Sequence, residues 1–258
     1  MTQLNTQVSG PDDAPAVVLI HSLATSSGLW SMQVPVWRRH LRLVVVDLPG
    51  HGASAALDGG ATMAGYAHLI ASELDRLGIH AAALVGLSLG SMVAQAFALA
   101  YPDRTRALVL AHGAAATGAH LREVWDGRIA AFRKNGFATE APATIARWFT
   151  AGFVDNAPLT VGWIESLVRE TSGEGYIAAI EAIQQLDHSA NLHKIRCPTL
   201  VIAGEHDVAL PPSAGAAIAA TIPQARFAVL KGAAHLGNVE QPEAFTELAG
   251  AFLREALA

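Results

Sequence analysis

The serine at position 88 stands in a sequence pattern that favours nucleophilic chemistry. Gly86 and Gly90 flank it two residues away on either side, after a small apolar run and before a segment with helical spacing. This G-x-S-x-G pattern is typical of a nucleophile elbow, a turn so tight that the serine backbone is strained and side chains at the glycine positions would collide with it. We therefore expect the Ser88 hydroxyl to stand clear of the end of a strand.

A serine hydroxyl is a poor nucleophile at neutral pH and needs a base that removes its proton. In chains that carry this elbow, the serine is followed by an acid after a late strand and then by a histidine. Asp207 and His235 fit this order, because each follows an apolar run typical of a buried strand. We expect Ser88, Asp207 and His235 to form a catalytic triad. Two alternatives stay open: Glu205 as the acid, and Asp207 as a helix-capping or turn residue.

An acyl-transfer site also needs two backbone N–H groups aimed at the oxygen that becomes negatively charged. One is expected from Leu89, which follows the nucleophile. The other is expected from the loop after the first apolar run, with Leu23 as the donor. Small and glycine residues at 24–28 allow that loop to turn tightly.

Composition limits the classes of function. Hydrophobic residues make up 52% of the 258-residue chain and charged residues 15%, so a large core is available and disorder is disfavoured. The net charge of −5 argues against nucleic-acid or anionic-membrane partners. A single cysteine excludes an internal disulfide. No apolar run is long enough to span a bilayer, and we expect a cytoplasmic protein.

The apolar runs also predict the fold class. They are continuous rather than alternating, which indicates strands covered on both faces and hence a mainly parallel sheet flanked by helices. Helical spacing is found at 62–77, 89–101 and 242–256. The predicted strands lie at 16–20, 43–46, 82–85, 107–110, 199–203 and 227–230.

Residues 118–190 interrupt this rhythm with several helical stretches that contain half of the aromatic residues of the chain. We expect them to form a helical cap over the carboxyl ends of the strands, where ligands bind in open α/β sheets. Residues 1–117 and 191–258 would then form the core domain. The alternative, which is the better expectation for most of these aromatics, is that they only pack the helices together.

Together these residues resemble the α/β-hydrolase superfamily over nearly the whole chain, and within it the 3-oxoadipate enol-lactonases. The elbow and the D-x-x-G-H-G-x-S turn are common to the superfamily. The segments R-W-F-T and A-H-L-G-N-V-E-Q-P are closer to the enol-lactonases. The stretches that carry the resemblance are residues 22–26, 47–54, 86–95, 147–150, 198–204 and 233–242.

The resemblance implies an α/β-hydrolase fold with the helical cap inserted after the sixth strand. It also implies hydrolysis of a small carboxylated lactone through an acyl-enzyme on Ser88, without a cofactor. A carboxylate on the substrate needs a cation, for which Arg147 is the best candidate in the cap, with Trp148 as a pocket wall. Their alternatives are a solvated helix arginine and a tryptophan in the core of the cap.

Other functions stay open on the same triad. These are a carboxylesterase, an acyl-homoserine lactonase, a carbon–carbon bond hydrolase of ring-cleavage products, and a ligand receptor that retains the triad. Metal-dependent lactonase chemistry is disfavoured, because the sequence contains neither an H-x-H nor an H-x-x-x-H pair. The sequence does not indicate the oligomeric state.

Overall fold

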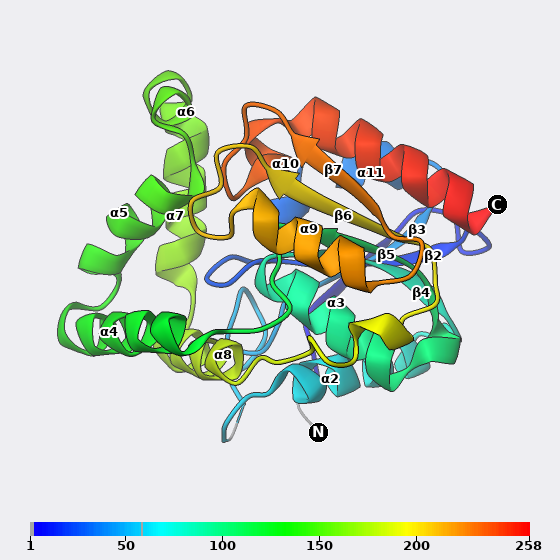
Figure 1. Cartoon of the computed structure of the whole chain (residues 1–258), viewed down its shortest axis with the longest axis horizontal. Coiled ribbons are helices and arrows are strands. Elements are labelled where there is room, and N and C mark those ends of the chain that lie inside the picture. Colours follow the sequence, from blue (N-terminus) through cyan, green and yellow to red (C-terminus); the bar gives the residue numbers. More distant parts are fainter. Residues whose placement is uncertain (1–2, 58) are drawn as a thin grey trace.

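A seven-stranded sheet carries the fold in the computed structural model, which describes residues 3–57 and 59–258 (Figure 1). Residues 1, 2 and 58 of the predicted core lie outside the described residues. The strand order is β1-β3-β2-β4-β5-β6-β7, and β1 alone runs antiparallel to its neighbour. The strands are β1 (Thr6–Ser9), β2 (Ala16–Ile20), β3 (Arg42–Val46), β4 (Ala82–Leu87), β5 (Thr105–Ala111), β6 (Thr199–Gly204) and β7 (Arg226–Leu230).

The fold class predicted from the sequence is confirmed. Every residue of β2, β4 and β6 is buried, as expected for parallel strands with helices on both faces. Strand β1 was not predicted, because its sequence T-Q-V-S has no apolar run. It pairs through its backbone with β3 at the edge of the sheet and leaves part of its side chains exposed.

Helices cover both faces of this sheet (Figure 1). On one face lie α2 (Met63–Arg76), α3 (Leu89–Ala100) and α9 (Pro212–Thr221), and on the other lie α1 (Val34–Trp37) and α11 (Pro242–Leu257). The ring centroids of Trp37 and Phe245 are 6.5 Å apart and join α1 to α11. In the part of the chain that the structure describes, no helix is long and apolar enough to cross a membrane.

Five α-helices lie between β5 and β6 and form the helical insertion (Figure 1). They are α4 (Ala119–Asn135), α5 (Phe137–Trp148), α6 (Ala151–Asn156), α7 (Pro158–Glu170) and α8 (Gly173–Gln184). An isolated bridge between Ala116 and Asp187 joins the two ends of the insertion. The domain limits at 118 and 190 stay a prediction.

The expected position of the insertion after the sixth strand was wrong. Among the described residues it follows the fifth strand, because only one strand, the antiparallel β1, precedes β2, β3, β4 and β5. The insertion nevertheless leaves the sheet between β5 and β6, so it begins at the carboxyl end of β5, at the same edge as the end of β4.

Candidate active site

Ser88 lies between the end of β4 and the start of α3, with a backbone φ of +54°. The two glycines around it are required by contact. A Cβ at Gly86 would lie 2.1 Å from the carbonyl oxygen of Gly90, and a Cβ at Gly90 would lie 2.1 Å from that of Ile20. Only glycine allows this close packing, so the local sequence produces the strained turn that presents Ser88 at the edge of the sheet.

The structure brings Ser88 together with the two residues expected to assist it. His235, in the loop between β7 and α10 (Gly237–Glu240), places Nε2 2.9 Å from Ser88 Oγ. Its Nδ1 lies 2.8 Å from Oδ2 of Asp207, in the loop after β6. All three residues are buried. The three groups therefore form one hydrogen-bonded chain across the carboxyl edge of the sheet.

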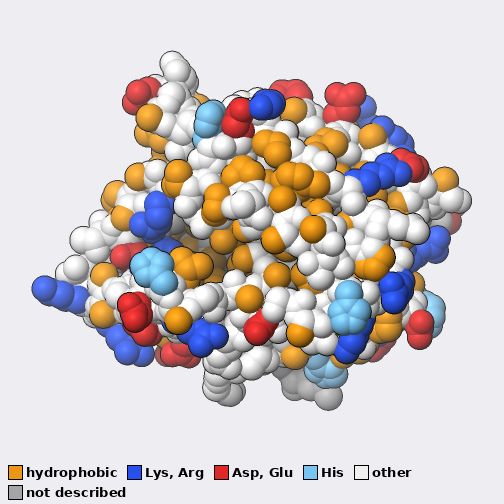
Figure 2. Space-filling model, in the orientation of Figure 1, with side chains coloured by type: hydrophobic (Ala, Val, Ile, Leu, Met, Phe, Trp, Pro, Cys, Tyr) orange, Lys and Arg blue, Asp and Glu red, His pale blue; other side chains and the backbone are white. Residues whose placement is uncertain are grey.

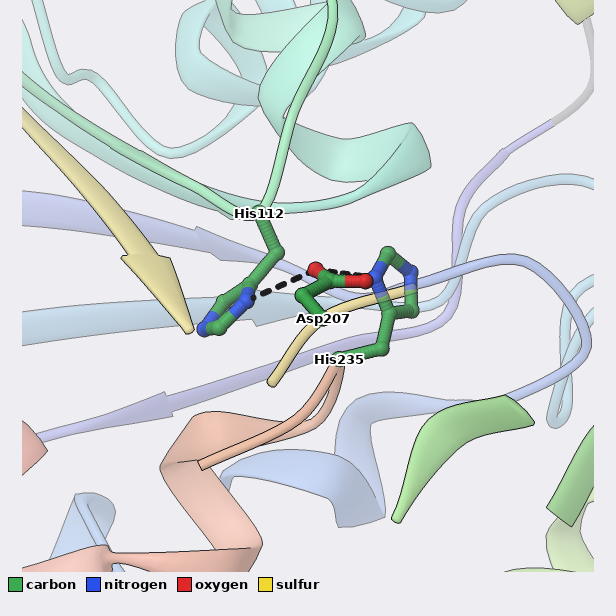
Figure 3. A group of neighbouring side chains, drawn as sticks. All are labelled: His112, Asp207 and His235. Atoms are coloured by element: carbon green, nitrogen blue, oxygen red, sulfur yellow. Dashed lines mark hydrogen bonds and ion pairs between the residues drawn. The ribbon is translucent and has the colours of Figure 1, made fainter. Parts of the chain in front are cut away.

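The Asp207 carboxylate accepts four hydrogen bonds. The backbone N–H groups of Ala209 and Leu210 donate to Oδ1 at 2.9 and 2.8 Å. His235 and His112 approach Oδ2 through Nδ1 at 2.8 and 3.2 Å (Figure 3). Burial alone would raise the pKa of Asp207, but the neighbouring His235 and the hydrogen bonds from both imidazoles outweigh burial and hold that pKa well below its usual range.

The ionised state of Asp207 determines which nitrogen of each imidazole carries a proton. An ionised carboxylate only accepts hydrogen bonds, so Nδ1 of His235 must be the donor. In the neutral ring, Nε2 then carries a lone pair that faces the Ser88 hydroxyl. This is the tautomer that a general base needs.

The alternative acid, Glu205, points elsewhere. Its Oε1 lies 2.7 Å from Nζ of Lys231, and its Oε2 accepts the backbone N–H of Gly232 at 3.0 Å. The Glu205 and Lys231 side chains are both at least partly exposed. Glu205 therefore stabilises the turn after β7, and the structure places Asp207 rather than Glu205 beside His235.

A cavity of about 280 Å³ opens beside Ser88 and His235. Leu121 and Val124 of α4 and the exposed Val208 line its mouth. Figure 2 shows hydrophobic side chains gathered in a hollow between the helical insertion and the core. Because most of the lining is apolar, the cavity suits a small substrate with few polar groups.

The two expected backbone donors lie next to the nucleophile. Leu23 lines the cavity together with Ser88, in a loop where Ala24 has a φ of +54°. Leu89 is the first residue of α3, and the first N–H groups of a helix have no partner within it. Their role as an oxyanion hole stays a prediction.

Arg147 and Trp148 both line the cavity. The Trp148 ring stacks near the His235 imidazole with 6.4 Å between centroids, so it forms a wall of the site. Arg147 is accompanied by Arg128 of α4, and both guanidinium groups donate to Thr144 Oγ1, at 3.1 and 3.2 Å. Burial and then the charge of Arg128 lower the pKa of Arg147.

The helical insertion is tied to the loop that carries the histidine. The carbonyl oxygen of Trp148 accepts the backbone N–H groups of His235 and Leu236 at 3.0 and 3.1 Å. The buried Glu240 accepts from the Thr150 backbone at 3.0 Å with Oε1 and from Ala234 at 2.7 Å with Oε2. The segments R-W-F-T and A-H-L-G-N-V-E-Q-P thus contact each other in space.

His112, Asp207 and His235 also place one donor atom each within 4.8 Å of the others, close enough to hold a metal ion. In the structure these atoms hydrogen-bond to one another instead, and each Nδ1 carries the proton that a metal would have to displace. The sequence-based expectation that no metal takes part stays a prediction.

Comparison with known proteins identifies the family. The family model described as the alpha/beta hydrolase fold matches residues 15–242. The chain belongs to the α/β-hydrolase family. It is 31% identical over 251 residues to 3-oxoadipate enol-lactonase 2 of Acinetobacter baylyi, covering 97% of this chain and 93% of that protein. The family model and this enol-lactonase relative support hydrolase function for the chain.

Two solved structures resemble this α/β hydrolase closely. The enol-lactonase from Burkholderia xenovorans is 34% identical with a TM-score of 0.94, and the match covers 98% of this chain and 97% of that one. A thermophilic esterase from Thermogutta terrifontis, solved with malate bound, is 31% identical with a TM-score of 0.93 over 99% and 94% of the two chains.

Sequence reasoning missed two residues of this α/β hydrolase that contact the predicted site. His112 follows β5 directly, and a polar residue at the carboxyl end of a parallel strand is a signal that could have found it. Arg128 lies within a helix of mixed charge, and no sequence signal distinguishes it from the neighbouring Arg133. Only the packing of α4 on α5 places Arg128 beside Arg147.

Proposed function

We propose that this α/β hydrolase opens a small carboxylated lactone of the 3-oxoadipate enol-lactone type through an acyl-enzyme on Ser88. The observation that supports hydrolysis is the chain of contacts from Ser88 Oγ through His235 to Asp207. The enol-lactonase relatives support the type of substrate.

The reaction begins when Ser88 Oγ attacks the ring carbonyl and its proton moves to His235 Nε2. The backbone N–H groups of Leu23 and Leu89 stabilise the oxyanion. The carbonyl re-forms as the ring C–O bond breaks, and the leaving enolate takes the proton from His235 and tautomerises to a ketone. Water then gives a proton to His235 and attacks the acyl ester, and Ser88 leaves with that proton as the acid is released.

The free carboxylate of the substrate binds Arg147, in this proposal. Within the described residues, Arg128 has Glu140 as a carboxylate partner at 3.4 Å, whereas Arg147 has none within ion-pair distance. Two cations that share one threonine beside a mainly apolar cavity attract an anion. Trp148 closes the wall of the cavity next to His235.

The proposal is tested with purified protein on 3-oxoadipate enol-lactone, a homoserine lactone and p-nitrophenyl acetate. We expect kcat/KM to be at least about tenfold higher for the enol-lactone than for the other two. Ser88→Ala should lower kcat on every turned-over substrate by about a thousandfold or more. The control Ser213→Ala removes an exposed hydroxyl from α9 and should leave kcat unchanged.

Each result has a distinct meaning. Equal activity of the wild type and Ser88→Ala would refute the acyl-enzyme. A preference for p-nitrophenyl acetate with full dependence on Ser88 would instead favour a carboxylesterase, the second candidate, which the similarity to the Thermogutta terrifontis esterase supports. Turnover too slow to measure on all three substrates would favour a ligand receptor.

A further inference from the structure

A second imidazole shares the carboxylate oxygen that His235 uses. His112 Nδ1 lies 3.2 Å from Asp207 Oδ2, and His235 Nδ1 lies 2.8 Å from the same atom (Figure 3). The His112 and His235 rings meet nearly edge to face, with 5.9 Å between centroids and 75° between planes. His112 is therefore a direct neighbour of the predicted triad, although it follows β5, whereas Ser88, Asp207 and His235 follow β4, β6 and β7.

The backbone fixes His112 in this place. It follows β5 with a φ of +49°, a strained conformation for a residue other than glycine. Its N–H donates to the carbonyl oxygen of Ile202 in β6 at 2.8 Å. The side chain is completely buried, and among the described residues its Nε2 has no hydrogen-bond partner. The one polar contact of the ring is thus the one to Asp207.

The charged surroundings determine the protonation of His112. The ionisable groups that face it are Asp207 and His235, which it contacts, and Glu240 of α10. Burial lowers the pKa of His112 more than the carboxylates raise it. The ring is therefore neutral, and since an ionised Asp207 only accepts, His112 carries its proton on Nδ1 and donates it.

The result is a carboxylate held at both oxygens. Two backbone N–H groups hold Oδ1, and two imidazoles donate to Oδ2. The bonds to Oδ1 fix that oxygen but not the direction of Oδ2, and His112 adds a second donor that holds Oδ2 beside the one from His235. A second donor on Oδ2 also draws negative charge away from the bond to His235.

We propose that His112 is a positioning residue that orients Asp207 toward His235 and shares the negative charge on Oδ2. The inference rests on the proposed function, because it acts through the triad. Without the His112 donor, more negative charge acts on His235 and stabilises its protonated form. The acidic limb of the kcat/KM profile then moves to higher pH, and the less ordered carboxylate lowers kcat.

The experiment compares two variants on p-nitrophenyl acetate. His112→Asn keeps an N–H donor near the position of Nδ1, and asparagine tolerates positive φ. His112→Leu fills a similar volume without a donor. We expect His112→Leu to lower kcat about tenfold with KM changed less than about twofold, and to raise the midpoint of the acidic limb by about half a pH unit or more. His112→Asn should restore both values.

Two further measurements separate the positioning role from a loss of folding. In the Asp207→Asn background, His112→Leu should change kcat less than about twofold, because the carboxylate it acts on is gone. The downfield ¹H–¹⁵N spectrum of the wild type should show protected imidazole N–H signals from the buried histidines, including His21 and His51, which donate to backbone carbonyl oxygens. His112→Asn should remove one of these signals. The control His188→Asn replaces a histidine outside the site and should keep the signal that His112→Asn removes.

The outcomes distinguish this inference from the proposed function. An unchanged pH profile and kcat in a folded His112→Leu variant would overturn the role of His112 while leaving Ser88-dependent hydrolysis intact. A His112→Asn spectrum that keeps every protected imidazole signal of the wild type would also overturn it, whether or not the protein turns over an ester. Activity that survives Ser88→Ala would instead refute the proposed triad, and the spectrum would still report on the His112 bond.

Discussion

At the scale of single residues, Arg147 and Arg128 differ in what already neutralises them. Arg128 lies 3.4 Å from the Glu140 carboxylate, donates to the Tyr176 hydroxyl at 3.0 Å and stacks 4.5 Å from the Trp125 ring centroid. Arg147 donates to Thr144, which is uncharged. Arg147 is therefore the cation that gains most from a substrate carboxylate, and Arg128 holds the local structure.

Replacing Arg147 should separate charged from neutral substrates. Because a charge-assisted contact to the carboxylate is lost, Arg147→Ala should raise KM for the enol-lactone by about tenfold to a hundredfold and change KM for p-nitrophenyl acetate less than about twofold. Steady-state kinetics on both substrates measure this. The control Arg133→Ala removes an exposed arginine of α4 and should change neither value. Similar KM changes for both substrates would exclude Arg147 as the carboxylate partner.

At the scale of elements, the helical insertion and the loop before α10 are joined by one buried carboxylate. Glu240 accepts from Thr150 on the insertion side and from Ala234 beside His235. The Trp148 carbonyl oxygen adds two hydrogen bonds to the same loop. A shift of the insertion must therefore move the His235 loop, which couples the cover of the cavity to the position of the base.

Glu240→Gln should break one of the two connections that Glu240 makes, either to Thr150 or to Ala234. An amide has one accepting oxygen, so either Thr150 or Ala234 then faces an NH₂ group and loses its partner. We expect the free energy of unfolding to fall by about 2–4 kcal/mol, and kcat to fall more than KM rises. Urea denaturation and kinetics measure the two effects. The same change at the exposed Glu247 of α11 is the control, and matching unfolding curves for both variants would contradict the link.

At the scale of the whole molecule, several histidines are buried in the neutral form. Burial is the main cause that lowers the pKa of His21, His51, His112 and His188, and the pKa of His51 falls to about 3. The unfolded chain binds protons at these rings below a pH of about 6.5. Unfolding then takes up protons, so stability is lost as the pH falls through this window.

We expect the free energy of unfolding to decrease as the pH falls from about 6.5, with the His51 contribution extending down to about 3. Urea denaturation at several pH values between about 7.5 and 4.5 measures the slope. His51→Asn should reduce that slope by up to about 1.4 kcal/mol per pH unit, whereas His120→Asn replaces an exposed histidine and should not. Equal slopes in the wild type and His51→Asn would contradict the contribution assigned to His51.

The cytoplasmic location expected from the sequence stays a prediction.

Much of the fold was predictable, because the signals that specify it are local. Continuous apolar runs are long enough to identify six of the strands, and the glycines at 86 and 90 identify the turn that holds Ser88. Strand β1 could not be predicted, because a polar edge strand forms only through backbone hydrogen bonds to β3, which the local sequence does not reveal. The meeting of Ser88, Asp207 and His235 followed from one rule, that the carboxyl ends of parallel strands share an edge.

What the tertiary structure alone decided depends on neighbours across the sheet and on the docking of helices. The strand order places β5 beside β6 and so brings His112 to Asp207. The packing of α4 on α5 brings Arg128 to Arg147. The packing of the insertion against the loop of His235 and α10 brings Thr150 to Glu240. Sequence patterns record which face of an element is buried. They do not record which distant side chain is buried against it, because that depends on the packing of the whole chain.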